Sequence, residues 1–163
     1  MTICGRGLRD HIRLLAPLFG FITLVWALRW AFDAAGFPHG LVRAFSVTGA
    51  TSLAILIAVW LIHMRAFGSY PNVILASLLL TVWSQVIIIL AICFSVLSKI
   101  ENVFTEPEFS IPTPDPNHIR HIVGHLTFGI GAGMLFGGAT GCLMLWLLRM
   151  LVPSRARGSS RQA

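Results

Sequence analysis

Four long apolar runs dominate the pattern of hydrophobic and polar positions along the chain. They cover about residues 14–32, 41–62, 73–97 and 122–148, and none of them contains an acidic residue. A membrane-spanning helix needs about 20 consecutive apolar residues, so each run is long enough to cross a bilayer. The pattern predicts an all-α polytopic membrane protein, in which residues 1–163 form a single domain with four transmembrane helices in an antiparallel bundle.

The first apolar run follows several arginines, as the hydrophobic part of a signal peptide does. Arg29 and Asp33, however, stand where a cleavage site needs small, neutral residues, and the run is longer than that of an ordinary signal peptide. We therefore expect a retained signal anchor that serves as the first span.

The positions of the basic residues predict the orientation of the spans, because segments rich in Arg and Lys stay on the cytoplasmic side. With the N-terminus inside, the inner segments carry a net charge of +7 and the outer segments a net charge of −1. Both termini are therefore predicted to be cytoplasmic. Arginine strongly outnumbers lysine, a bias that fits a GC-rich bacterial genome, and we expect a multi-pass protein of the cell inner membrane.

The longest predicted outer loop, about residues 98–116, is rich in proline and acidic residues. Its proline spacing favours an extended course over a helix. At its end, Asp115 and Pro116 have the residue types of an N-cap and a first helical position. The fourth helix is therefore expected to start at Pro116, above the membrane surface.

The fourth run is rich in glycine, which lets helix backbones approach each other closely in lipid. One face repeats glycine every four residues, as in a glycine zipper: Gly129, Gly133, Gly137 and Gly141. The opposite face repeats it every seven residues: Gly124, Gly131 and Gly138. Packing inside one chain and packing between chains both explain these repeats. Gln85 is a strongly polar side chain near the middle of the third run, and we expect it to form an interhelical hydrogen bond.

Histidines at the start of the fourth span carry the candidate chemistry. His118, His121 and His125 fall within a narrow arc of one helix, and the last two can meet on successive turns. Imidazoles together with a carboxylate such as Glu108 suit Zn²⁺ or a similar divalent metal. The alternative is an interfacial role, in which the rings lie between lipid and water. No nearby residue is singled out as a nucleophile or general base, so no catalytic residue is assigned.

Composition excludes several classes of function. Hydrophobic residues make up 56% of the chain and charged residues 11%, far below the roughly 25% charged residues of soluble domains. The arginines lie at the ends of apolar runs rather than in aromatic-rich patches, so nucleic-acid binding is not expected. The middle of each span lacks the ionisable residues on which ion-coupled transport depends. The cysteines are widely spaced and offer no disulfide framework.

Two classes of function remain open. The leading hypothesis is a small non-enzymatic integral membrane protein that packs in the lipid bilayer with itself, as a homo-oligomer, or with another membrane protein. The alternative is a metal-binding protein, in one form a metal-dependent hydrolase, that uses the outer histidines. No cofactor other than such a metal ion is expected.

Overall fold

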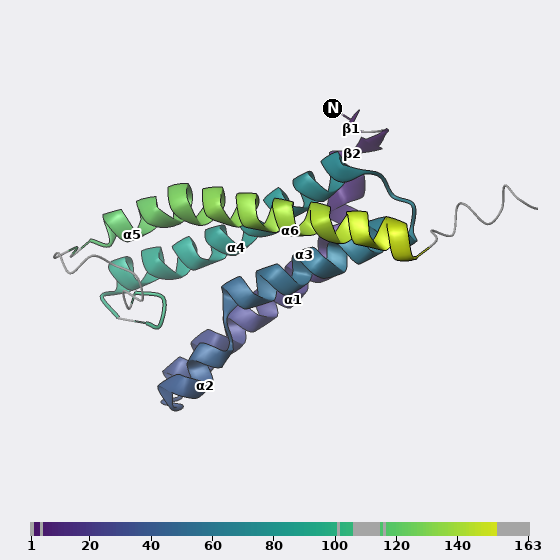
Figure 1. The fold of residues 1–163 in the computed structure, drawn as a ribbon. Helices are drawn as coiled ribbons and strands as arrows, with labels where there is room; N and C mark the ends of the chain where they lie inside the picture. The colour runs from purple at the N-terminus through teal and green to yellow at the C-terminus, as the bar shows by residue number, and fades with distance from the viewer. Residues whose placement is uncertain (1, 4, 101, 106–114, 116, 153–163) are drawn as a thin grey trace, which may run out of the picture.

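The structure is a computed structural model that describes residues 2–3, 5–100, 102–105, 115 and 117–152. These residues are helical apart from short connections and a two-residue antiparallel pair of strands (Figure 1). The elements in chain order are β1 (Thr2–Ile3), β2 (Arg6–Gly7), α1 (Leu8–Ala34), α2 (His39–Ala44), α3 (Val47–Met64), α4 (Tyr70–Ser98), α5 (Ile119–Gly124), the π-helical turn η1 (His125–Gly129) and α6 (Ile130–Leu151).

Four helical segments are long and apolar enough to cross a membrane, as the sequence predicts. They are α1, the pair α2 and α3, α4, and the continuous helix formed by α5, η1 and α6. Each contains the apolar run predicted for it. The chain therefore has the build of a multi-pass membrane protein.

The helix boundaries follow from polar side chains and from backbone geometry at the ends of the apolar runs. The Gly7 amide donates to the Asp10 carboxylate (2.9 Å) where α1 begins, and the Gly49 amide donates to the Ser46 hydroxyl (3.1 Å) where α3 begins. These bonds satisfy amides that the first turn of a helix leaves without a partner. At the other end of α4, Lys99 adopts a left-handed conformation (φ 57°) that stops the helix.

The second and fourth predicted spans differ from expectation in detail. The run 41–62 is divided into α2 and α3 at Phe45 and Ser46, because the Ser46 cap starts a new helix inside the apolar sequence. The fourth helix begins at Ile119, and the preceding His118 has a left-handed backbone (φ 50°). The expected start at Pro116, a residue outside the described part of the chain, was therefore wrong by three positions.

The two ends of the helix bundle hold different residues, and we name them for what they carry. At the turn end, the connection between α3 and α4 lies beside β2 and the last turns of α6: Arg6 Nε donates to the Phe67 carbonyl (3.1 Å), and Arg149 Nη2 donates to the Gly68 carbonyl (3.4 Å). At the histidine end lie α2, α5 and the last turns of α1 and α4 (Figure 1). There the Val103 amide donates to the Asp33 carboxylate (2.9 Å), which ties the segment after α4 to α1.

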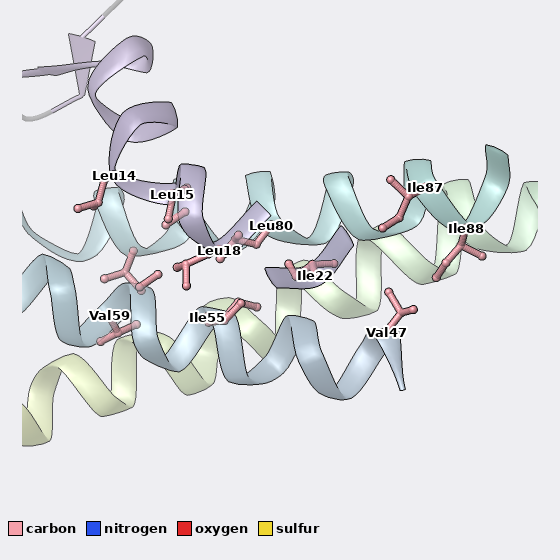
Figure 2. Close-up of a cluster of buried hydrophobic side chains, with 14 of the residues drawn as sticks. Leu14, Leu15, Leu18, Ile22, Val47, Ile55, Val59, Leu80, Ile87 and Ile88 are labelled. Carbon is pink, nitrogen blue, oxygen red and sulfur yellow. The ribbon is translucent and has the colours of Figure 1, made fainter. Parts of the chain in front are cut away.

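The core lies between α1, α3 and α4. Figure 2 shows aliphatic side chains from the three helices meeting there, among them Leu15 and Ile22 of α1, Ile55 of α3 and Leu80 of α4. Lipid is as apolar as these side chains, so close packing rather than the hydrophobic effect must hold such helices together in a membrane.

Helix α6 contacts α3 and α4 through its four-residue glycine face. A Cβ atom added at any of these glycines would come within 2.6–2.8 Å of a neighbouring side chain, closer than atoms can approach. The nearest side chains are Gln85 for Gly129, Thr81 for Gly133, Ile55 for Gly137 and Val73 for Gly141. Ile55 belongs to α3, and the other three side chains belong to α4. On α4, the contact positions run from Gln85 to Val73 as the glycines run from Gly129 to Gly141. The glycines of the four-residue face therefore allow α3 and α4 of the same chain to pack closely against this helix.

The seven-residue glycine face of the same helix is different. Beyond the backbone of its own helix, a Cβ atom added at Gly124, Gly131 or Gly138 would meet no atom within 4 Å. Gly124 and Gly131 are exposed, whereas Gly138 is buried. Large apolar residues are also exposed here: Phe128 in η1, and Leu135 and Phe136 in α6. Helix α6 therefore packs on one side and is open on another.

Candidate functional site

The histidine cluster sits where the fourth helix changes its winding. His121 lies in the last turns of α5, and His125 is the first residue of the π-helical turn η1, which ends at Gly129. A single π-helical turn inside an α-helix is rare and is frequently found at functional sites. Gly129 also lets α4 come close, since its missing Cβ leaves room for the Gln85 side chain.

Gln85 fixes the ring of His125. Its Oε1 atom lies 2.6 Å from Nδ1 of His125, so Nδ1 carries the hydrogen and donates it across the helix interface. This is the interhelical hydrogen bond expected of Gln85, and the structure identifies its partner. A neutral imidazole with the hydrogen on Nδ1 has its lone pair on Nε2. The Nε2 atom of His125 is therefore available as an acceptor or as a metal ligand.

His121 faces that lone pair. The Nε2 atoms of His121 and His125 lie 3.2 Å apart, and their rings are stacked with centroids 4.9 Å apart. Without a metal ion, Nε2–H of His121 donates to Nε2 of His125. Two nitrogens bound to one tetrahedral ion at about 2.0–2.1 Å lie roughly 3.3 Å apart. The separation of the two Nε2 atoms therefore already matches that of two imidazole ligands on a single zinc ion.

Near the pair lie His118, a predicted ligand, and Asp115, the predicted N-cap. The His118 ring lies beside His121, with centroids 6.4 Å apart and the planes tilted by 54°. The Asp115 carboxylate accepts a hydrogen bond from the backbone amide of His121 (3.2 Å), so it caps the helix from outside its first turn. Glu108 lies outside the described residues. Among the residues that the structure describes, no three His, Cys, Asp or Glu side chains form a metal-binding group.

Sequence reasoning identified both histidines of the pair but not the role of Gln85 beside them. Two features could have suggested it. Gln85 is a polar residue in an otherwise apolar run, and Gly129 follows His125 by one turn, where a small residue admits a side chain from the next helix. Neither feature gives the register of α4 against α6, which decides the pairing.

The chain was compared with protein-family models, curated proteins and solved structures. No protein-family model, curated protein or solved structure matches it. Its class therefore rests on the fold, which is helical, has four segments long and apolar enough to span a membrane, as multi-pass membrane proteins have, and holds a histidine pair at one end.

Proposed function

We propose that this chain is a non-enzymatic, multi-pass protein of a bacterial inner membrane that binds a divalent metal ion, such as Zn²⁺, at its outer end. The observation that carries the proposal is the pair of converging imidazole nitrogens, His121 Nε2 and His125 Nε2, 3.2 Å apart. The site is assigned a binding role, because no described side chain beside the pair is assigned as a general base or nucleophile.

The orientation follows from the charges at the two ends. The described residues of the turn end include five exposed arginines and a single acidic residue, Asp10; the arginines are Arg6, Arg9, Arg13, Arg65 and Arg149. Basic residues next to membrane spans remain in the cytoplasm. We therefore place the turn end and both termini inside, the histidine end outside, and the four spans in antiparallel order.

The proposed metal site has two protein ligands and one supporting residue. Metal-bound histidines commonly donate their second ring N–H to another group, which fixes the tautomer and raises ligand basicity. Gln85 receives this hydrogen bond from His125. Zn²⁺ is usually four-coordinate, so two further positions would be filled by water or by ligands from elsewhere.

A zinc titration by calorimetry tests the proposal. The parent should bind Zn²⁺, and the His121→Ala/His125→Ala variant should lose that binding. His39→Ala is the matched control, because His39 is exposed at the same end but belongs to α2. Equal affinities for the parent and the double variant, or no binding tighter than about 1 mM (~4 kcal/mol), would refute the proposal.

A second candidate function is association with another copy of the chain. The support for it is the open glycine face of α6, combined with the fact that this helix has the least buried of the four candidate spans. Small residues at such a face allow the close backbone contact that stabilises helix pairs in lipid. A homo-oligomer would bury Gly124 and Gly131, which are exposed in the single chain, whereas Gly138 is already buried within it.

A further inference from the structure

The turn end contains two arginines that are held in place by the same short connection. Arg6, in β2, lies with its guanidinium carbon 5.0 Å from the centre of the Phe67 ring, and its Nε donates to the Phe67 carbonyl. Arg149, near the end of α6, lies 4.9 Å from the centre of the Tyr70 ring, and its Nη2 donates to the Gly68 carbonyl. The two ends of the chain therefore bring one guanidinium each to the connection between α3 and α4.

The connection between α3 and α4 packs against the buried side chain of His11. The His11 ring, fully buried, meets the Phe67 ring edge-on with centroids 5.1 Å apart. Its Nδ1 donates to the Gly7 carbonyl (2.9 Å), and its Nε2 lies 3.3 Å from Oδ1 of the buried Asn72. Phe67 is thus fixed between His11 and Arg6. An arginine resting on a fixed ring loses less conformational freedom when it binds a ligand.

Both guanidiniums keep donors for a ligand. Arg6 uses Nε in its bond to Phe67, which leaves its two Nη groups, and Arg149 uses a single Nη2 bond to Gly68. Both residues are exposed. Arginine binds phosphate oxygens through pairs of parallel N–H donors, which gives both strength and geometry. Their chemistry fits a phosphate group at the surface of the turn end.

The surroundings favour a phospholipid over a free anion. Large apolar residues that follow the two arginines in the sequence are exposed: Leu8 and Ile12 in the first turns of α1, and Met150 and Leu151 in the last turn of α6. Acyl chains can cover such residues, whereas inorganic phosphate cannot. Basic pockets between spans on the cytoplasmic side are known to bind anionic headgroups.

We propose that Arg6 and Arg149 form a binding site for the phosphate of an anionic phospholipid, such as cardiolipin or phosphatidylglycerol, at the turn end. This site lies at the opposite end from the histidine pair and is independent of the metal. It requires that the turn end meets a membrane surface that contains anionic lipid.

Native mass spectrometry of the full chain in detergent tests the proposal with cardiolipin, phosphatidylglycerol and phosphatidylcholine as probes. The parent should retain the anionic lipids in preference to phosphatidylcholine. An arginine that contacts the headgroup directly should contribute about a fivefold preference, so Arg6→Gln/Arg149→Gln should lose most of it. Arg9→Gln/Arg13→Gln is the charge-matched control, since both residues are exposed arginines of α1, and it should stay within about twofold of the parent.

Three results would overturn the proposal: no preference in the parent, equal losses in the two double variants, or displacement of the lipid by millimolar inorganic phosphate. The variant Arg6→Lys/Arg149→Lys separates a loss of lipid binding from a loss of folding. Lysine keeps the positive charge but lacks the paired N–H donors of arginine. With thermal stability in phosphatidylcholine equal to that of the parent, this variant should show weaker retention of anionic lipid. Undiminished retention would exclude the paired-donor geometry.

Discussion

Gln85 is a polar residue in the middle of an apolar helix, and its position explains how the histidine pair is organised. Its Oε1 accepts from His125 Nδ1, and that bond directs the lone pair on Nε2 of His125 toward His121. In the proposed site, Gln85 would orient the imidazole ring of His125 and would not bind the metal ion itself. Its contribution to metal binding should therefore depend on its ability to accept a hydrogen bond.

Replacing Gln85 tests this dependence. Loss of a hydrogen-bonded partner of a metal ligand typically lowers metal affinity about 10- to 100-fold, so Gln85→Leu should weaken Zn²⁺ binding by that factor. Gln85→Glu keeps an acceptor at the same place and should retain the parent affinity or exceed it. Calorimetric titration of both variants measures the difference. Equal affinity for the Leu variant and the parent would mean that the His125 ring is not oriented by Gln85.

At the residue scale, the sequence predicted that His121 and His125 lie close together, but it did not predict the hydrogen bond between His125 and Gln85. The spacing of His121 and His125 is local, so helical geometry alone brings their rings together. The contact between His125 and Gln85 joins residues 40 positions apart, and it depends on how α4 lies against α6. Local periodicity contains no information about that register.

At the element scale, α6 has two glycine faces with different surroundings. Gly133 lies on the packed face, where an added Cβ would come 2.6 Å from Cγ2 of Thr81. Gly131 lies two residues away on the open face, where an added Cβ would meet nothing within 4 Å. The same substitution at these two positions should therefore have different effects.

Gly133→Leu should lower the thermal stability of the chain in detergent, because overpacking a close helix contact costs about 1–3 kcal/mol or more. Gly131→Leu should leave the stability of the single chain close to that of the parent. If copies associate through the open face, Gly131→Leu should also reduce the oligomeric mass seen by light scattering. Equal stability of Gly133→Leu and the parent would contradict the observed packing of α6.

The sequence predicted the number and the approximate extent of the helices that are long and apolar enough to span a membrane, because long apolar runs have few alternatives. It did not predict the break at Phe45 and Ser46, since a serine within a long apolar run is common in continuous spans. The sequence also did not predict that α5 starts as late as Ile119. Asp115 does cap the helix, but its carboxylate reaches the amide of His121, six residues along the chain, rather than an amide closer to it.

At the scale of the whole molecule, the charge distribution predicts the topology, and cysteine labelling in intact cells tests it. In a background without Cys4, Cys93 and Cys142, an impermeant reagent should label a cysteine at Thr113 but not one at Ser69 or Ser159. The reason is that the net charge of +7 is assigned to the inner segments and −1 to the outer ones. Labelling at Ser159 before the cells are opened would contradict the placement of both termini inside.

The assembly of the turn end could not have been predicted from the sequence. Arg6 meets Phe67 over 61 positions, and Arg149 meets Gly68 over 81 positions. From the sequence, each arginine is accounted for by the rule that basic residues beside membrane spans stay in the cytoplasm, and this rule depends on charge alone. Only the folded chain brings both to the same connection and places an aromatic ring under each.

Metal analysis of the chain purified from membranes, without chelators, tests the proposed function most directly. Two imidazole ligands with a fixed tautomer should retain about one divalent metal ion per chain in the parent. The His121→Ala/His125→Ala variant, folded and purified in the same way, should have lost it. Equal metal content in the two proteins, or a metal-free parent from zinc-replete cells, would contradict the account.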